Sequence, residues 1–413
     1  MPPSPSAAPP PPSAATAFCR VEEAVAELRA GRLIIVTDDE DRENEGDLIG
    51  IAETITPEQV AFMARKGAGM LCVPVSTAIA QRLDLKDMVP QNREAFRTHF
   101  TVTVDAAAGI TTGISAADRA HTIRLLANPA TQPDDLVKPG HISPLVAKPG
   151  GVLRRAGHTE AAVDLARMAG FQEAGVLIEI MNADGTMARV PDLETFAAKH
   201  GLKMCSIADL IAWRRQREKL IEKMEVVDMP TDYGVFKLHL YRSTLDDVHH
   251  VALVMGEVDA AEPTLVRVHS ECLTGDVFGS RRCDCGSQLH AAMERVAKEG
   301  RGIILYMRGH EGRGIGLHGK IKAYKLQEQG RDTVEANLEL GYPSDLRDYG
   351  VGAQILSDLG VRQLRLMTNN PRKVVALDGH NLILVEQVPI RSEPFPENAK
   401  YLETKKTKMG HAL

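Results

Sequence analysis

The length of the chain constrains its fold more than any other feature, because 413 residues exceed what one hydrophobic core supports. Single cores stop growing at roughly 250–300 residues, and longer chains divide into domains. Hydrophobic residues make up 44% of the sequence and charged residues 25%, a balance typical of globular proteins. We therefore expect two or three domains, each with its own core.

Apolar periodicity predicts a mixed α/β or α+β architecture. The first half contains expected strands at 33–36, 70–75, 99–104 and 175–181, with expected helices at 21–31, 57–66, 115–127 and 159–169. The second half contains expected strands at 251–258, 264–269, 303–307, 364–367 and 382–385, with expected helices at 286–299, 318–329 and 349–359. The stretch 206–224 indicates one further helix with a densely charged later part. We expect two domains, 18–214 and 228–413, each a mixed β-sheet layered with helices, joined by a linker at 215–227.

Composition excludes several classes of protein. The formal net charge of -6 argues against general nucleic-acid binding, which needs a strongly basic surface. No apolar run approaches the roughly eighteen residues of a membrane span, and the uncharged Pro- and Ala-rich segment 1–17 matches neither a secretory signal nor a transit peptide. We expect this segment to be a disordered tail, and the protein to be cytoplasmic with no membrane or nucleic-acid partner.

An acidic run follows the first expected strand. It spans Asp38 to Asp47 and holds seven carboxylates in ten positions. A charge run alone is more often a solvated surface loop. Its place at a strand end, between two apolar segments, instead favours a ligand-binding loop. A few of these carboxylates would suffice for Mg²⁺, which keeps several waters or substrate oxygens.

Phosphate-binding groups gather before the helix expected at 159–169. Arg154, Arg155, His158 and Thr159 lie at its start, where helix N–H groups attract anions. The alternative is helix capping by Thr159 beside a solvated arginine pair. Glu179 stands inside an apolar strand, where a carboxylate is rarely buried without a partner or a function.

Half of the six cysteines cluster in the second half, at Cys272, Cys283 and Cys285. Close spacing of this kind indicates a metal in a reduced compartment more than a disulfide scaffold. With three thiolates the fourth zinc position stays open, which is typical of hydrolytic zinc sites. We expect the following helix and the adjacent Arg281 and Arg282 to favour thiolates. His269 or His290 could instead close the site, and three reduced thiols without metal are a further alternative.

Two more segments of the second half indicate nucleotide chemistry. The run Gly314-x-Gly316-x-x-Gly319 formally matches a dinucleotide fingerprint, so a nicotinamide-dependent oxidoreductase is one alternative function. That reading leaves the cysteines unexplained. Near residue 370, Pro371 can open a helix whose first turn holds Lys373, a position that suits a bound phosphate.

The first half resembles the 3,4-dihydroxy-2-butanone 4-phosphate synthases over roughly residues 20–213. The resemblance lies in DDEDRENEGD, FTVTVDAAAGITTGISAADR, PGHISPL, GGVLRRAGHTEA and DGTMAR. It implies that Glu43 and His158 bind Mg²⁺ or Mn²⁺ and that His141 and Glu179 transfer protons. It further implies that ribulose 5-phosphate is bound by Arg42, Glu43, Asp47, Arg155, His158, Thr159 and Glu179. The implied products are L-3,4-dihydroxy-2-butanone 4-phosphate and formate.

The second half resembles GTP cyclohydrolase II over about residues 228–413, through SRRCDCG, EGRGIGL, DTVEAN, DLRDYG and TNNPRK. It implies one Zn²⁺ on Cys272, Cys283 and Cys285, and Mg²⁺ bound with GTP. The implied GTP contacts are Arg267, Val268, His269, Ser270, Glu271, Gln288, Glu311, Gly312, Arg313, Tyr324, Thr333, Thr368 and Lys373.

Asp345 and Arg347 match the catalytic pair of that family, a base and a nucleophile. Because a guanidinium offers no lone pair, we expect Arg347 to stabilise charge on the cleaved phosphate. The implied products are a diaminopyrimidine ribosyl phosphate, formate and pyrophosphate.

Both resemblances lead to precursors of riboflavin, and the analogy also implies a homodimer formed through the first half. Three alternatives remain open: only one half is active, the chain is a zinc-based nucleic-acid module, or it is the oxidoreductase named above.

Overall fold

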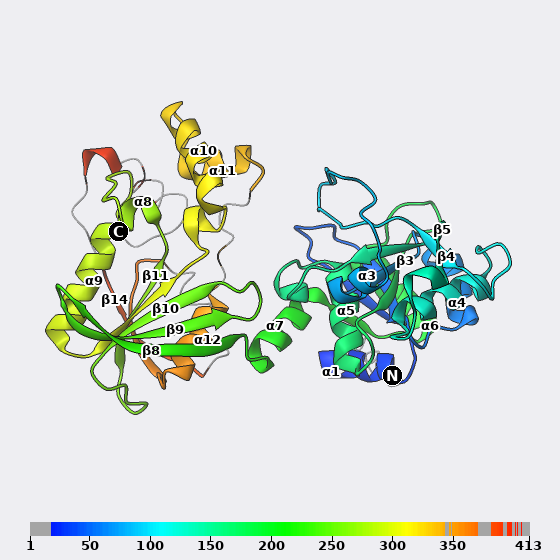
Figure 1. Cartoon of the computed structure of the whole chain (residues 1–413), viewed down its shortest axis with the longest axis horizontal. Coiled ribbons are helices and arrows are strands. Elements are labelled where there is room, and N and C mark those ends of the chain that lie inside the picture. The colour runs from blue at the N-terminus through cyan, green and yellow to red at the C-terminus, as the bar shows by residue number, and fades with distance from the viewer. Residues whose placement is uncertain are drawn as a thin grey trace, which may run out of the picture. The chain divides into compact units, whose positions relative to one another are not determined.

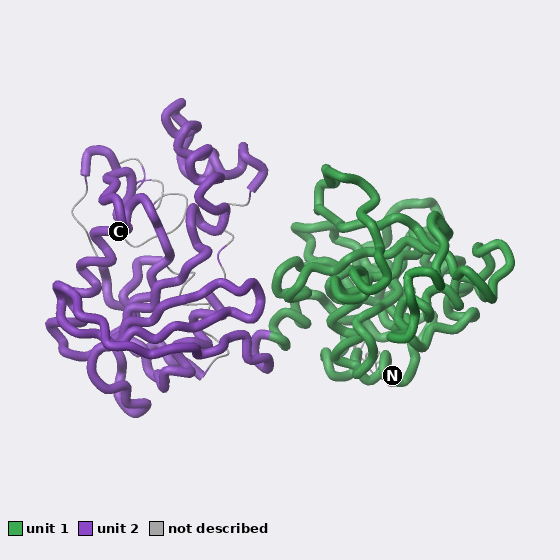
Figure 2. The backbone as a smooth tube through the Cα atoms, in the orientation of Figure 1, with its two compact units in different colours: residues 1–214 green, residues 215–413 purple. Residues whose placement is uncertain are grey.

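A computed structural model describes residues 18–342, 347, 349–370, 381–390, 395–398, 401, 403 and 406. The chain divides into two compact units, residues 1–214 and 215–413 (Figure 2). The expected tail at 1–17 lies outside the described residues. Among the described residues, no helix is long and apolar enough to span a membrane.

Unit 1 alternates helices and strands along the chain (Figure 1). Its main elements in chain order are α1 (Val21–Arg29), β1 (Ile34–Thr37), β2 (Gly46–Ile51), α2 (Pro57–Phe62), the π-helix η1 (Met63–Gly67), β3 (Cys72–Val75), α3 (Thr77–Arg82), β4 (Val104–Ala106), α4 (Ala116–Ala127), β5 (Leu136–Val146), α5 (His158–Ala169), β6 (Gly175–Glu179), α6 (Val190–His200), β7 (Met204–Ser206) and α7 (Ile207–Arg217). Short 3₁₀ turns cover Pro133–Asp135 and Gly151–Leu153.

The seven strands described in unit 1 form one mixed sheet in the order β4-β5-β3-β6-β2-β1-β7. Strands β1/β7 and β3/β5 pair in parallel, and the other neighbours are antiparallel. Alternate residues of β1 point to opposite faces, so Ile35 packs with α2, α4 and α6 while Ile34 packs with α1, α5 and α7. Helices therefore cover both faces of this sheet.

Unit 2 has a long antiparallel start and a parallel end. Its elements are β8 (Ile221–Thr231), β9 (Gly234–Ser243), β10 (His249–Met255), β11 (Thr264–Ser270), α8 (Leu273–Asp276), α9 (Cys285–Glu299), β12 (Gly302–Met307), the 3₁₀ turn η4 (Glu311–Arg313), α10 (Gly316–Glu328), α11 (Thr333–Glu339), α12 (Gly350–Asp358), β13 (Gln363–Met367), β14 (Ile383–Val388) and the 3₁₀ turn η5 (Pro396–Asn398).

The described strands of unit 2 form a second seven-stranded mixed sheet, in the order β14-β13-β11-β12-β10-β9-β8. The first four strands in that order pair in parallel and the rest are antiparallel. Helix α12 packs on one face and α9 on the other. The chain leaves β11 toward α8 and leaves β12 toward α10, so both turns lie at the same end of the sheet (Figure 1). The predicted fold class, two domains each with a mixed sheet layered with helices, is confirmed.

Two expected elements are wrong. The helix expected at 206–224 ends at Arg217, and β8 begins at Ile221 and pairs with β9 as far as Thr231. The segment 215–227, expected as a linker, thus holds the end of α7 and the start of β8. Pairing with a neighbouring strand overrides the helix preference of the Glu- and Lys-rich sequence.

The strand expected at 99–104 is also largely absent. Phe100 and Thr101 make isolated bridges to two different partners, Leu145 and Asp87, and the regular strand β4 begins only at Val104. Because Phe100 and Thr101 bridge two different segments, no continuous β-ladder forms across 99–104.

Two candidate metal centres

The acidic run after β1 is organised by one of its own carboxylates. Asp38 is buried, and its Oδ2 accepts hydrogen bonds from Arg42 Nη1 at 2.8 Å and the Glu43 backbone N–H at 3.1 Å. Its Oδ1 accepts from the Glu45 N–H at 2.8 Å. Arg42 also lies 2.9 Å from Glu43 Oε1 and over the ring of Phe96. Asp38 thus folds the loop back on itself, while Asp39, Glu40 and Asp41 remain exposed to solvent.

Glu43 and His158 come together from distant parts of unit 1. His158 is the first residue of α5, and its Nδ1 lies 3.8 Å from Glu43 Oε2 and 4.0 Å from Asp47 Oδ2. Its Nε2 faces the Val36 carbonyl at 3.2 Å, an arrangement that fixes the ring and leaves Nδ1 toward the carboxylates. Ligand atoms of Asp38, Glu43 and His158 all lie within 4.8 Å of one another.

The electrostatics of this cluster favour a cation. Burial opposes the charged form of His158, but Asp47, Glu43 and Asp38 outweigh it and raise its pKa to about 9. Burial and the neighbouring Glu179 and Glu43 carboxylates raise the pKa of Asp47 to about 7, against the opposing influence of His158. The buried Asp47 Oδ1 has no hydrogen-bond partner among the described residues. A divalent cation fits a set with this much unbalanced negative charge.

Glu179 ends β6 directly opposite Asp47 of β2. Its Oε2 accepts a hydrogen bond from the Met70 N–H at 2.7 Å. A Cβ on Gly69 would lie 2.4 Å from the same oxygen, so only glycine fits this approach. Glu179 therefore has a fixed orientation beside the Asp47 carboxylate.

The His141 ring is held by a carboxylate that sequence reasoning missed. His141 Nδ1 lies 2.6 Å from Asp105 Oδ2, and the His141 N–H donates to Asp105 Oδ1 at 3.0 Å. Asp105 is buried at the β4/β5 pairing. The role of Asp105 could not be recognised from the sequence, because a single Asp after an apolar run usually marks only the end of a strand.

Arg155 and Thr159 both lie at the start of α5, as expected from the sequence. Each guanidinium nitrogen of Arg155 already donates one bond: Nη1 to Glu160 Oε2 at 2.6 Å, Nη2 to Thr98 Oγ1 at 2.8 Å, and Nε to the Phe96 carbonyl at 3.1 Å. Thr159 is buried. Oxygen atoms of Phe96, Thr98 and Glu160 thus fix the orientation of the Arg155 guanidinium.

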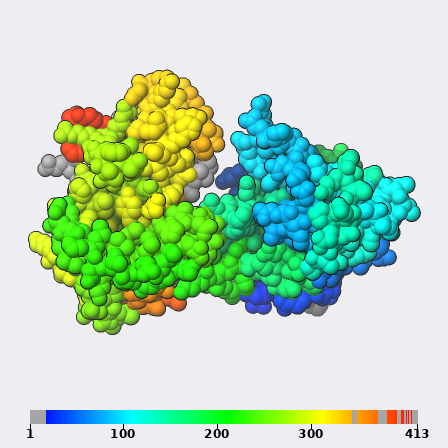
Figure 3. Space-filling model, in the orientation of Figure 1, coloured from blue at the N-terminus to red at the C-terminus, as the bar shows by residue number. Residues whose placement is uncertain are grey.

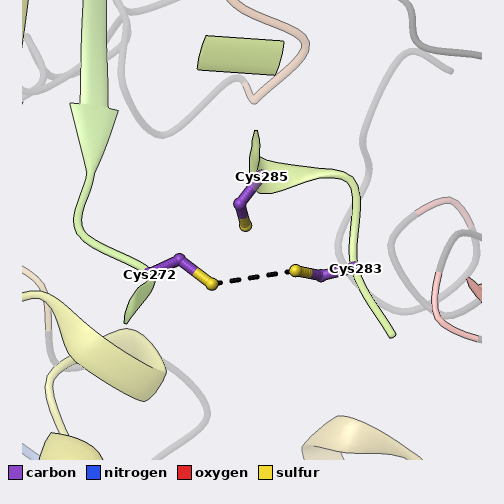
Figure 4. Close-up of side chains that lie close together, drawn as sticks. All are labelled: Cys272, Cys283 and Cys285. Atoms are coloured by element: carbon purple, nitrogen blue, oxygen red, sulfur yellow. Dashed lines mark hydrogen bonds between the residues drawn. The ribbon is translucent and has the colours of Figure 1, made fainter. Parts of the chain in front are cut away.

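The three cysteines of the second half meet at the end of β11 and the start of α9. Cys272 follows β11, Cys285 opens α9, and the Sγ atoms of Cys272 and Cys283 are 3.7 Å apart (Figure 4). All three sulfurs lie within 4.8 Å of one another. Gly275 packs directly against two of the sulfurs, because a Cβ there would lie 2.9 Å from Cys283 Sγ and 3.2 Å from Cys272 Sγ. Three thiols at this separation match a zinc donor set.

The three thiols differ in pKa, because a negative charge on one opposes ionisation of the others. The neighbouring Cys283 and Cys285 thiols, with Lys320, hold the pKa of Cys272 well below its usual range. Cys272 in turn raises the pKa of Cys283 to about 11 and that of Cys285 well above its ordinary value. Arg281 lies over Phe395, and Arg282 pairs with Glu328, so neither is seen to hydrogen bond to a sulfur. Among the described residues, the cation that donates to a sulfur is Lys320.

No fourth histidine, cysteine or carboxylate joins the three sulfurs in the part of the chain that the structure describes. His269 Nε2 lies 3.1 Å from both oxygens of Asp276, and Asp276 also accepts from Tyr306 and the Cys272 N–H. The His290 ring neighbours Tyr233. The alternative that either histidine closes the site is not supported.

A pocket opens beside the cysteines, and most of the expected GTP contacts line it. These are Arg267, His269, Ser270, Glu271, Gln288, Glu311, Gly312, Arg313, Tyr324, Thr333 and Thr368, together with Arg347. The segments that build it, near residues 270–285 and 310–340, lie side by side on the surface of unit 2 (Figure 3). Val268 is an exception, because its side chain is buried in the core against α12. Asp345 and Lys373 lie outside the described residues.

The pocket also contains residues that sequence reasoning missed. His310 lies 3.3 Å from Ser270 Oγ, and Lys320, Asn337 and Tyr401 line the wall. Asn337 is 2% exposed, and its Nδ2 has no hydrogen-bond partner among the described residues. Asn337 follows Thr333 by four residues on α11, so helical spacing from Thr333 could have indicated it.

The fold and these clusters define a class: a two-domain α+β enzyme with an oxygen- and nitrogen-ligand centre in one unit and a three-thiol centre in the other. Comparisons with known proteins narrow this class. The family model for 3,4-dihydroxy-2-butanone 4-phosphate synthase matches residues 22–213, and the model for GTP cyclohydrolase II matches residues 222–389.

Relatives match along almost the whole chain. Riboflavin biosynthesis protein RibBA of Aquifex aeolicus is 59% identical over 396 residues, covering 95% of this chain and 98% of that protein. RibBA of Bacillus cereus strain ATCC 14579 is 57% identical, covering 96% and 99%. The crystal structure of RibBX from A. baumannii, a two-domain 3,4-dihydroxy-2-butanone 4-phosphate synthase, has a TM-score of 0.70 and 40% identity, covering 91% of this chain and 100% of that one.

The chain therefore belongs to the RibBA family of bifunctional riboflavin biosynthesis enzymes, with a 3,4-dihydroxy-2-butanone 4-phosphate synthase domain followed by a GTP cyclohydrolase II domain. Both sequence resemblances are confirmed, and the oxidoreductase and nucleic-acid alternatives are set aside.

Proposed function

We propose that the two activities use separate metal centres, one in each unit. Unit 1 converts ribulose 5-phosphate to L-3,4-dihydroxy-2-butanone 4-phosphate and formate, with Mg²⁺ or Mn²⁺ on Glu43 and His158. Unit 2 hydrolyses GTP to the diaminopyrimidine ribosyl phosphate, formate and pyrophosphate, with Zn²⁺ on three cysteines and Mg²⁺ accompanying GTP. The observation that carries the proposal is the presence of one oxygen- and nitrogen-ligand cluster and one sulfur cluster, each within its own unit.

In unit 1, His141 and Glu179 move the protons. Asp105 accepts from His141 Nδ1, so Nε2 carries the lone pair that takes a proton. Glu179 keeps one oxygen on the Met70 N–H and has lone pairs left for exchange with substrate hydroxyls. A cation held by Glu43 and His158 would stabilise negative charge on the substrate oxygens. Arg42, Arg155 and Thr159 bind the phosphate at the start of α5.

In unit 2, zinc supplies Lewis acidity for hydrolysis of the guanine imidazole ring. The pocket residues position the nucleotide beside it. Arg267 donates hydrogen bonds to the Met367 carbonyl at 2.8 Å and to Gln288 Oε1 at 2.6 Å. These bonds hold a positive charge in a fixed position in the pocket lining. Arg347 lies 3.4 Å from Ser270 Oγ and over the Tyr349 ring, where it stabilises charge on the phosphate. Asp345 serves as the base and Lys373 as a phosphate ligand in this proposal.

Formate release tests the assignment. The wild-type chain is assayed with ribulose 5-phosphate plus Mg²⁺ and, separately, with GTP plus Zn²⁺ and Mg²⁺. Glu179→Gln should abolish only the first activity and Cys283→Ser only the second. Loss of both activities in either folded variant, or of neither, would overturn the separation. If the wild type releases formate from one substrate alone, only one half is active.

We further propose that the enzyme is a cytoplasmic homodimer, as the family analogy implied. Light scattering of the purified chain checks this, because a monomer at assay concentration contradicts it.

A further inference from the structure

Lys320 is a buried cation that neither family resemblance had assigned a role. It lies on α10 and is 7% exposed. A buried lysine almost always has a charged partner, because removing an ammonium group from water is costly. Its neighbours therefore indicate what the residue does.

Two acceptors hold the ammonium group of Lys320. Nζ donates to Cys272 Sγ at 3.2 Å and to Glu311 Oε1 at 2.5 Å. The other oxygen of Glu311 accepts from the Leu273 N–H at 2.7 Å, one residue past Cys272. Lys320 and Glu311 thus clamp the turn that carries Cys272, from two different points.

Charge explains why a cation belongs at this place. Three thiolates around one Zn²⁺ leave a net charge of minus one, and the nucleotide bound beside them is an anion. An ammonium group that donates to one sulfur removes this surplus locally and stabilises the thiolate. The carboxylate of Glu311 fixes the direction of the donor.

We propose that Lys320 is a positioning residue of the zinc centre: it donates a charge-assisted hydrogen bond to the Cys272 thiolate, and Glu311 orients it. The inference rests on the proposed zinc site. Partners outside the ligand set commonly set metal affinity, and their loss costs roughly 10–100-fold. Lys320 acts on zinc before any nucleotide binds, which separates this role from that of a phosphate ligand.

The test measures zinc and cobalt binding without nucleotide. Lys320→Met keeps the length of the side chain and removes the charge, and Lys320→Arg restores a cation. Lys322→Met is the matched control, because Lys322 is exposed on the same helix. Zinc affinity is measured by competition with a chromophoric chelator. The Co²⁺-substituted protein is measured by its thiolate-to-cobalt charge-transfer band.

We expect Lys320→Met to weaken zinc binding by about tenfold or more. Its cobalt charge-transfer band should move to longer wavelength, because a thiolate without its hydrogen bond gives up electron density more easily. Lys320→Arg should restore most of both properties, and Lys322→Met should match the wild type. If Lys320→Met does not fold, Lys320→Gln replaces it.

Wild-type zinc affinity and an unshifted cobalt band in folded Lys320→Met would overturn the inference. A raised KM for GTP in that case would identify Lys320 as a nucleotide ligand. If the proposed zinc site itself is wrong, Cys283→Ser will bind as much zinc as the wild-type chain. That outcome differs from failure of the Lys320 inference, in which Cys283→Ser still loses the zinc that the wild-type chain binds.

Discussion

Asp105 fixes the orientation of the His141 ring, because its carboxylate accepts from Nδ1 and from the backbone N–H of the same residue. Asp105→Asn should lower kcat with ribulose 5-phosphate by about 100-fold, since the amide no longer selects the tautomer with a free Nε2. Asp87→Asn is the control, because Asp87 pairs with His99 on the exposed surface. Equal effects of the two variants on formate release would contradict this role.

His158 also predicts how metal binding in unit 1 depends on pH. Its pKa is raised to about 9, so at neutral pH the ring holds a proton that a metal ion must displace. The apparent affinity for Mg²⁺ should therefore rise with pH, by up to about tenfold per unit, and level off above pH 9. Titration calorimetry in buffers of different ionisation enthalpy checks this through proton release. An affinity independent of pH from 6 to 9 would contradict the prediction.

Sequence reasoning found the residues whose type alone indicates chemistry and missed those whose role depends on a neighbour. The cysteine spacing and the acidic run pointed to Cys272, Cys283, Cys285 and Glu43. Asp105 and Lys320 carry no such signal, because an Asp after a strand and a Lys on a helix are ordinary surface residues in most proteins. Only the fold brings Lys320 to Cys272, 48 positions away in the chain.

Among the secondary-structure elements, the short helix α8 packs closely beside the cysteine sulfurs because Gly275 has no side chain. Gly275→Ala should weaken zinc binding by at least about tenfold, since its Cβ would press on two sulfurs. Gly279→Asn is the control in the same loop: a Cβ at Gly279 meets nothing within 4 Å, and asparagine tolerates its positive φ. Zinc competition assays decide, and equal affinities for both variants would contradict the packing argument.

Elements with strong periodicity could be predicted, and those shaped by pairing could not. Helix α5 and strand β12 follow the expected ranges closely. Strand β2 was missed because Gly46, Asp47 and Gly50 have poor strand propensity. Its glycines are needed for packing, since a Cβ on Gly46 would lie 2.4 Å from the Leu193 side chain. No local pattern contains that information.

At the scale of the whole molecule, each unit has its own core clusters on both faces of its own sheet. Removing zinc with a chelator should lower the midpoint of one thermal unfolding transition and leave the other in place, because metal binding stabilises only the unit that holds it. Formate release from ribulose 5-phosphate, assayed with added Mg²⁺, should persist in the zinc-depleted protein. Calorimetry that shows both transitions shifting together would contradict this independence.

Anomalous X-ray diffraction from crystals grown with zinc and soaked in Mn²⁺ would locate both metal ions. We expect a zinc peak bound by Cys272, Cys283 and Cys285 with no fourth protein ligand, and a manganese peak between Glu43 and His158. A fourth protein side chain completing the zinc sphere, or manganese absent from Glu43 and His158, would contradict this expectation.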